Sequence, residues 1–208
     1  MNYFQISTND YLSKHTDAYY HVRYTRMGKP GNPNYLNDLK NTYNDFSKKN
    51  LIKLRDAEQA LREVLQIDLP NFPQFLTIDP IVVCVVPRAK AEGRYHANQQ
   101  LFRATVQSVV NGLPGFVDGT SYLLRHTNTK TTHLPDPTPN YDNDGHEPYP
   151  GITEATCTIS SEVENKDVLL IDDIYTPGVN IDEDAIEAIL NAGAHTVTFY
   201  SVGKVQRD

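Results

Sequence analysis

A pair of adjacent acids at the end of an apolar run is the clearest candidate for chemistry in this chain. Asp172 and Asp173 follow residues 168–171, an unbroken apolar run that is typical of a buried strand in a parallel sheet. A turn containing Thr176 and Gly178 comes next and leads into a helical pattern over residues 180–192. Such a turn lies at the carboxyl end of its strand, where open α/β sheets bind ligands.

The residue types of this segment favour a ribose phosphate as the ligand. The helix start offers unpaired N–H groups and partial positive charge to an anion, and Gly178 lets the backbone approach a phosphate closely. The two carboxylates can accept hydrogen bonds from vicinal hydroxyls. A phosphate and a diol side by side describe a ribose phosphate, so we expect this ligand between the acids and the helix.

The elements around this segment predict an α/β fold. Residues 81–86 form a second β-branched run, and residues 196–202 form a further strand after Gly193, which ends the helix. Strand, helix and strand at these lengths make a βαβ unit. Asn180 followed by Glu183 predicts a capping box at the helix start. The remaining predicted elements are strands at residues 19–24, 116–117, 122–124 and 156–159, and helices at residues 55–67 and 97–110.

Residues 168–180 (VLLIDDIYTPGVN) resemble the phosphoribosyl diphosphate (PRPP) loop of type I phosphoribosyltransferases. Residues 86–90 (VPRAK) and 93–99 (GRYHANQ) are similar to the diphosphate-binding loop and next helix of the ComF-type and amidophosphoribosyltransferase-like members. Residues 124–132 (LRHTNTKTT) resemble the start of their flexible loop, and the polar stretch 127–151 has the length of a lid or binding loop. The resemblance implies a type I phosphoribosyltransferase fold, with a mainly parallel sheet flanked by helices.

The similarity covers roughly residues 80–204, which defines the expected domains. Residues 76–208 would form the phosphoribosyltransferase-like core. Residues 1–75 match nothing in the family, so we expect them to form a hood-like N-terminal extension that recognises the acceptor. The zinc ribbon of ComF-type proteins is absent, and no protein-bound metal is expected.

The resemblance also implies a role for each matched position. Asp172 and Asp173 would contact the ribose 2- and 3-hydroxyls, and Arg125 and Lys130 would come from the mobile loop to the reacting centre. The other matched positions would hold the 5-phosphate (Thr176, Gly178, Val179 and Asn180) and the diphosphate (Arg88, Ala89 and Lys90). Mg²⁺ would arrive bound to the PRPP diphosphate. The reaction would be displacement of diphosphate at the anomeric carbon, in which the protein mainly positions groups and screens charge.

Several positions depart from the family pattern. Pro177 stands where the family has a second Thr or Ser, so the phosphate cradle lacks one hydroxyl and one N–H. Asn180 replaces the final Thr or Ser. Three acids occupy the first helical turn, at residues 182–184, and they either face solvent or weaken the phosphate site. Tyr175 is expected either to stack on a substrate base or to pack in the core.

These departures leave more than one function open. The first is a PRPP-dependent phosphoribosyltransferase of unknown acceptor. The second is a non-catalytic protein of the same fold that binds PRPP or a ribose 5-phosphate nucleotide and regulates, and the third is a defence-type effector within a larger assembly. His96 and His126 flank the expected site, where each would serve either in proton transfer or as an ordinary surface residue.

Composition and charge indicate which kinds of partner and which cellular compartment to expect. The chain has 208 residues, a formal net charge of −7 and a pI near 5.4, which argues against nucleic acid as the default partner. No apolar run is long enough for a membrane span, and the N-terminus has no signal pattern. Two cysteines, Cys84 and Cys157, suit a reduced cytoplasm, with Cys84 expected to be buried. Because the family commonly dimerises, a homodimer is the expected assembly.

Overall fold

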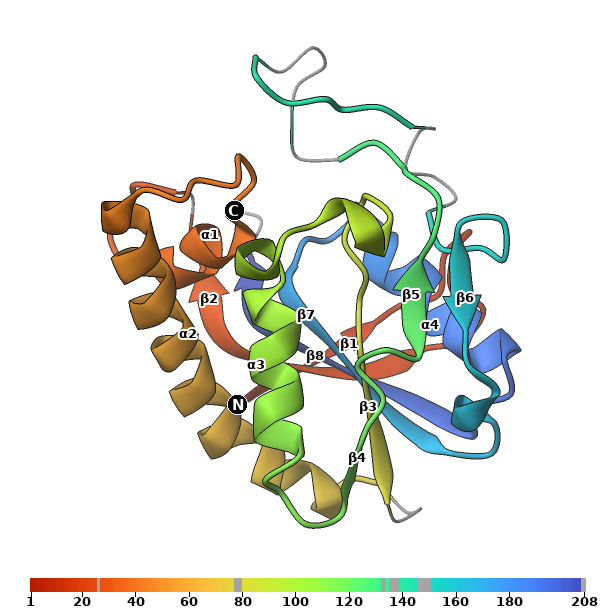
Figure 1. Ribbon diagram of the computed structural model, residues 1–208. Coiled ribbons are helices and arrows are strands. Elements are labelled where there is room, and N and C mark those ends of the chain that lie inside the picture. The colour runs from red at the N-terminus through yellow and green to blue at the C-terminus, as the bar shows by residue number, and fades with distance from the viewer. Residues whose placement is uncertain (26, 77–79, 132–133, 135–138, 146–150, 207–208) are drawn as a thin grey trace.

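A single six-stranded sheet organises the computed structural model, which describes residues 1–25, 27–76, 80–131, 134, 139–145 and 151–206 (Figure 1). The strand order is β1-β2-β8-β7-β3-β4, and only the β1–β2 pair is antiparallel. The strands are β1 (Asn2–Ile6), β2 (Thr16–Tyr24), β3 (Ile81–Val85), β4 (Phe116–Asp118), β7 (Asp167–Tyr175) and β8 (Thr196–Val205). The chain therefore has an α/β fold with a mostly parallel central sheet, which confirms the predicted class.

Helices flank this sheet on both faces. The helices are α1 (Asn34–Lys40), α2 (Lys48–Asp68), α3 (Leu101–Val110) and α4 (Ile181–Asn191). Figure 1 shows α2 and α3 on one side, whereas α4 lies on the other together with the hairpin of β5 (Leu123–Arg125) and β6 (Cys157–Ile159). Short 3₁₀ helices cover Leu69–Gln74, Glu92–Arg94, Ala97–Gln99 and Ser161–Val163.

The side chains of β7 alternate between two apolar cores. Leu169 and Ile171 pack with apolar residues of α1, α2 and α3, whereas Val168 and Leu170 pack with α4 and the β5–β6 hairpin. This alternation follows from the two-residue period of a strand. Because both faces are covered by apolar residues, the predicted unbroken apolar runs of β3 and β7 are fully buried, Cys84 included.

The strand β7 is longer than the sequence predicts. Its pairing with β8 continues to Tyr175, which lies opposite Lys204, so Asp172 and Asp173 belong to the strand and not to the turn. The βαβ unit made by β7, α4 and β8 is confirmed. The capping box at its helix is wrong, because Asn180 takes a left-handed conformation and its side chain makes no cap hydrogen bond.

Residues 1–75 are built into the sheet instead of forming a separate domain. The strand β2 pairs in parallel with β8, and β1 adds the antiparallel edge. The helices α1 and α2 join α3 in the layer over one face. Strands from both sides of the boundary expected at residue 75 therefore belong to the same sheet.

No helix in the described part of the chain has the length and apolar character needed to cross a bilayer.

Candidate functional site

Two loops that meet at the carboxyl edge of the sheet form the candidate site. The strands β3 and β7 are parallel neighbours, with Val85 opposite Ile171, and the Val86 amide donates to the Ile171 carbonyl at 3.0 Å. The segments that follow the two strands therefore begin side by side. This edge holds the predicted diol-binding acids, the predicted phosphate turn and the predicted diphosphate loop, as the position of a ligand site in an open α/β sheet requires.

The adjacent acids point to opposite faces of the sheet because they lie in a regular strand. Asp173 faces the α1 layer, where its Oδ2 lies 3.5 Å from Nζ of Lys40 at the end of α1. Asp172 faces α4, where its carboxyl group hydrogen-bonds the side chain of Asp182. The structure thus does not bring the two carboxylates onto one surface, and it gives each a different partner.

Burial and neighbouring charge control the protonation of this edge. Burial, and then the charge of Asp173, raise the pKa of Asp172 to about 7. Burial and the carboxyl of Asp172 raise the pKa of Asp182 well above its ordinary value. On the other face, the carboxylate of Asp173 raises the pKa of Lys40. A hydrogen bond between two carboxyl groups needs a proton on one of them, so Asp172 and Asp182 share a proton near neutral pH.

The three acids in the first turn of α4 are buried, which contradicts the interpretation that they face solvent. The side chain of Asp182 packs against Asp172, and Glu183 accepts a hydrogen bond from the Tyr175 hydroxyl at 2.9 Å. Asp184 accepts from the amides of Gly151 and Ile152 at 2.6 and 3.0 Å. One carboxylate oxygen each of Asp182 and Glu183 is buried without a hydrogen-bond partner among the described residues. These acids therefore belong to the internal structure of the site.

The predicted phosphate turn has the features of a type II β-turn. The Val179 amide donates to the Thr176 carbonyl at 3.2 Å, Pro177 occupies the second position, and Gly178 has a φ of 76° at the third. Pro177 is thus the residue that this turn favours. Asn180 follows with a φ of 63°, and its side-chain oxygen accepts from the Asn9 amide group at 3.2 Å. Asn180 is therefore linked to the N-terminal region and not to the helix backbone.

Two arginines predicted to meet the diphosphate or the reacting centre are tied to main-chain oxygens. Arg88 donates to the carbonyls of Lys40, at 2.7 Å, and of Gln99, and its guanidinium lies 4.4 Å from the Tyr95 ring centroid. Arg125 donates to the carbonyls of Arg88, at 2.8 Å, and of Gly151, at 2.6 Å. The expectation that Arg125 lies on a mobile loop is wrong, because it belongs to β5 and is 3% exposed.

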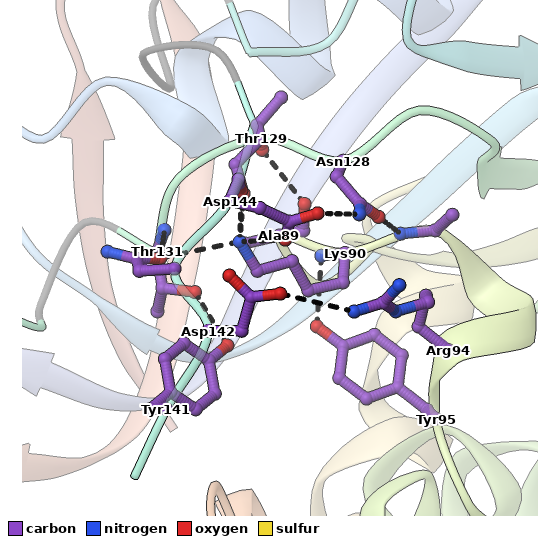
Figure 2. Close-up of polar contacts among 12 residues, drawn as sticks. Ala89, Lys90, Arg94, Tyr95, Asn128, Thr129, Thr131, Tyr141, Asp142 and Asp144 are labelled. Carbon is purple, nitrogen blue, oxygen red and sulfur yellow. Dashed lines mark hydrogen bonds and ion pairs between the residues drawn. The ribbon is translucent and has the colours of Figure 1, made fainter. Parts of the chain in front are cut away.

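The predicted diphosphate loop lies beneath the polar segment that follows β5. Figure 2 shows Ala89 and Lys90 among residues of that segment, which are Asn128, Thr129, Thr131, Tyr141, Asp142 and Asp144. The Ala89 carbonyl accepts from the Thr129 amide at 2.8 Å, and the Lys90 ammonium donates to the Thr129 carbonyl at 2.9 Å. The structure therefore brings the diphosphate loop and the predicted flexible loop together, with Lys130 on the latter. The stretches 132–133, 135–138 and 146–150 of that loop lie outside the described residues.

The other candidates have ordinary structural surroundings. The His96 side chain is exposed and meets the Phe46 ring edge-on, with 5.7 Å between the ring centroids. His126 is also exposed, with one ring nitrogen 3.0 Å from the Thr127 hydroxyl oxygen. Tyr175 packs in the core between Phe4 and Phe199, so a stacking role on a substrate base is excluded for it.

Three residues of the site gave no usable signal in the sequence. Lys40 comes from the unmatched N-terminal region, and Asp182 could be seen only as one member of an acidic run. Asp144, which lies 3.4 Å from the Lys90 ammonium, sits in a polar loop of unspecified structure. Each of the three depends on a contact between residues far apart in the chain, which a local pattern does not report.

No protein-family model matches the chain, and no curated protein is significantly similar to it in sequence. A function must therefore be inferred from the residues of the site and their geometry.

Proposed function

We propose that this chain has the type I phosphoribosyltransferase fold and binds PRPP at the carboxyl edge of its sheet. The observation that carries the proposal is the meeting of two loops on neighbouring parallel strands. The last residues of β7 supply adjacent acids, the segment after β7 supplies a Gly-containing turn and a helix start, and the segment after β3 supplies Arg88 and Lys90. A ribose phosphate bearing a diphosphate has anionic groups at both ends, and this edge offers a polar loop for each.

The proposed reaction transfers the ribose 5-phosphate group to an acceptor and releases diphosphate. Asp172 and Asp173 face opposite sides of the sheet, so one of the two would orient the ribose through its hydroxyls. The turn from Thr176 to Asn180 would hold the 5-phosphate through backbone N–H groups and side-chain donors. Lys90 and the backbone of Ala89 would meet the diphosphate. Lys40 adds a cation beside Asp173 at the same edge. These residues position the reacting bond and screen charge, which is how catalysis of such a displacement is achieved.

The donor set of the site suits a metal ion that enters with its substrate. Among the described residues, no three His, Cys, Asp or Glu side chains are grouped so as to hold a metal ion. A Mg²⁺ ion would thus take its ligands chiefly from the diphosphate oxygens, with at most one carboxylate of the Asp172–Asp173 pair nearby. When bound, Mg²⁺ neutralises negative charge on the departing diphosphate.

A second candidate function, non-catalytic binding of a nucleotide or PRPP, is favoured by the state of the cationic residues. Arg88, Lys90 and Arg125 all donate to protein oxygens, and Pro177 removes one N–H from the phosphate turn. A protein that binds the ribose phosphate end without releasing diphosphate needs none of the three cations. A regulator of this kind would use the acids and the turn alone.

Calorimetry with ribose 5-phosphate tests the shared element of both candidates. The double variant Asp172→Asn with Asp173→Asn should bind this ligand about tenfold more weakly or not at all, because neutral amides replace the carboxyl groups that would accept hydrogen bonds from the ribose hydroxyls. The control is Asp56→Asn, whose side chain is exposed on α2. Unchanged affinity in the double variant would reject the site. Diphosphate release from PRPP and Mg²⁺, tested with bases and amines, then separates the enzyme from the regulator.

A further inference from the structure

Lys90 is a buried cation, and within the described part of the chain its ammonium group donates hydrogen bonds to one polar segment. It is 5% exposed, and its ammonium donates to the Thr129 carbonyl at 2.9 Å, the Asn143 side-chain oxygen at 3.3 Å and the Asp144 carbonyl. The Asp144 carboxylate lies 3.4 Å away and supplies the opposing charge. We call residues 128–131 and 141–145 the strap, because both parts lie across the loop that carries Lys90 (Figure 2).

The strap is fastened to this loop by further contacts. The Thr129 amide and hydroxyl both donate to the Ala89 carbonyl, at 2.8 and 3.0 Å, and the Ala91 amide donates to the Asn128 side chain at 2.9 Å. The two parts of the strap are joined by a hydrogen bond of 2.8 Å from Asn128 to the Asp144 carboxylate. Several hydrogen bonds therefore hold the strap on the loop that carries Lys90.

Gly145 allows the two parts of the strap to approach each other. Its φ is 110°, and a Cβ atom at this position would lie 2.5 Å from the main-chain oxygen of Asn128. A side chain here would both strain the backbone and push the two parts apart. The glycine thus provides a way to loosen the strap that changes no charge.

We propose that the strap is an internal competitor for the anionic group that Lys90 would bind, with the Asp144 carboxylate and two main-chain carbonyls in the place of diphosphate oxygens. This inference rests on the proposed function and adds regulation to the same site. In the free protein the strap holds Lys90, and a diphosphate reaches Lys90 only by displacing it. Only molecules in which the strap has left Lys90 can bind the anion there. The apparent affinity for the anion is therefore the intrinsic affinity multiplied by the fraction of such molecules.

Because the Lys90 ammonium is buried, the strap cannot simply move away from it. Other oxygen atoms must replace those of the strap. A buried Lys that lost its oxygen partners would keep an uncompensated charge, which is strongly unfavourable. The strap can leave only when other anionic oxygens or water take its place. Diphosphate binding and strap release are therefore coupled, and each should promote the other.

Calorimetry with magnesium diphosphate tests the proposal in three variants. Asp144→Asn removes the competing charge, and Gly145→Ala loosens the strap by sterics alone. Asp142→Asn is the matched control, because Asp142 carries the same charge on the same strap but is 73% exposed and forms an exposed ion pair with Arg94, at 3.7 Å. The Asp144 side chain is 39% exposed, so solvent screens its attraction to Lys90 and limits the effect of removing its charge. We therefore expect Asp144→Asn to bind diphosphate about threefold to tenfold more tightly than the wild type. Gly145→Ala should shift affinity in the same direction, and Asp142→Asn should not.

Limited trypsin digestion reads the position of the strap directly. Cleavage after Lys130 should be faster in Gly145→Ala than in the wild type, and diphosphate should accelerate it in the wild type. Ribose 5-phosphate carries no diphosphate to compete with the strap for Lys90, so its affinity should be the same in all four proteins. Equal diphosphate affinity in wild type and both strap variants, with ribose 5-phosphate still bound, would overturn the inference alone. An equal gain in Asp142→Asn would also overturn it, and binding of neither ligand by any protein would overturn the proposed function as well.

Discussion

Replacing Asp182 by Asn should make the protein more stable at pH 8 and leave its stability at pH 4 unchanged. In the wild type the half-buried carboxyl of Asp172 and the buried carboxyl of Asp182 face each other and are hydrogen-bonded, which requires a shared proton. An Asn at position 182 has nearly the same shape. Its amide can donate to an ionised Asp172 with no proton needed, so the cost of ionising the pair disappears.

The pH range of the effect follows from the raised pKa of Asp182. Burial and the carboxyl of Asp172 raise this pKa well above its ordinary value of 3.8, so above about pH 4 the folded state keeps a proton that the unfolded state has released. The stability contributed by this proton is fully present below about pH 4 and is lost as the pH rises through the folded-state pKa. Burial and the charge of Asp173 still raise the pKa of Asp172 in the variant, so only the contribution of Asp182 is removed. We expect a gain of about 1 to 3 kcal/mol for Asp182→Asn at pH 8.

Urea denaturation followed by circular dichroism at pH values from 4 to 8 measures this difference. Comparing variant with wild type cancels groups that titrate alike in both, such as Asp68 and Asp118, whose pKa values are lowered. Asp56→Asn, exposed on α2, is the control and should follow the wild type within about 0.5 kcal/mol at every pH. A variant that is less stable than the wild type at pH 8, or a difference that does not vary with pH, would refute the shared proton.

Two further substitutions test the turn and the buried acids beside it. Pro177→Thr returns a hydroxyl and an N–H to the phosphate turn, so ribose 5-phosphate should bind about threefold to tenfold more tightly in calorimetry; weaker binding would mean that the turn serves a different ligand. Tyr175→Phe removes the donor to Glu183, whose other oxygen is already unpartnered, and should lower the free energy of unfolding by about 1 to 3 kcal/mol in urea. Tyr3→Phe, which loses an exposed hydroxyl contact to Asp17, should change it by less than about 0.5 kcal/mol, and a similar loss in both would assign no special role to Glu183.

The fold was predictable wherever local patterns dominate. The apolar runs of β3 and β7 are buried strands, and the helix after the turn at 176–180 forms as its spacing indicates. The end of β7 was not predictable, because Asp172 and Asp173 break the apolar pattern. Pairing with β8 as far as Lys204 keeps these acids in the strand, and this pairing partner lies beyond the reach of a local pattern.

The site was predictable in its location but not in its contacts. The two loops of the site follow neighbouring strands, whereas the partners of their charged side chains come from distant segments. Asp184 meets the amides of residues 151 and 152, and Asp173 meets Lys40 of α1. A run of acids at a helix start normally indicates a solvated end that favours the helix dipole. Here tertiary packing buries the run.

The state of Lys90 separates the two candidate functions more sharply than Pro177 does. Pro177 suits its type II turn and removes one donor among several, so either function tolerates it. Lys90, in contrast, is enclosed by oxygens of the strap, and a phosphoribosyltransferase would have to exchange them for diphosphate oxygens in every turnover. A regulator that reads only the ribose phosphate end would keep the strap closed in both states. An enzyme would have to displace the strap from Lys90, whereas a regulator would keep it in place. Displacement of the strap by diphosphate therefore distinguishes the two candidate functions.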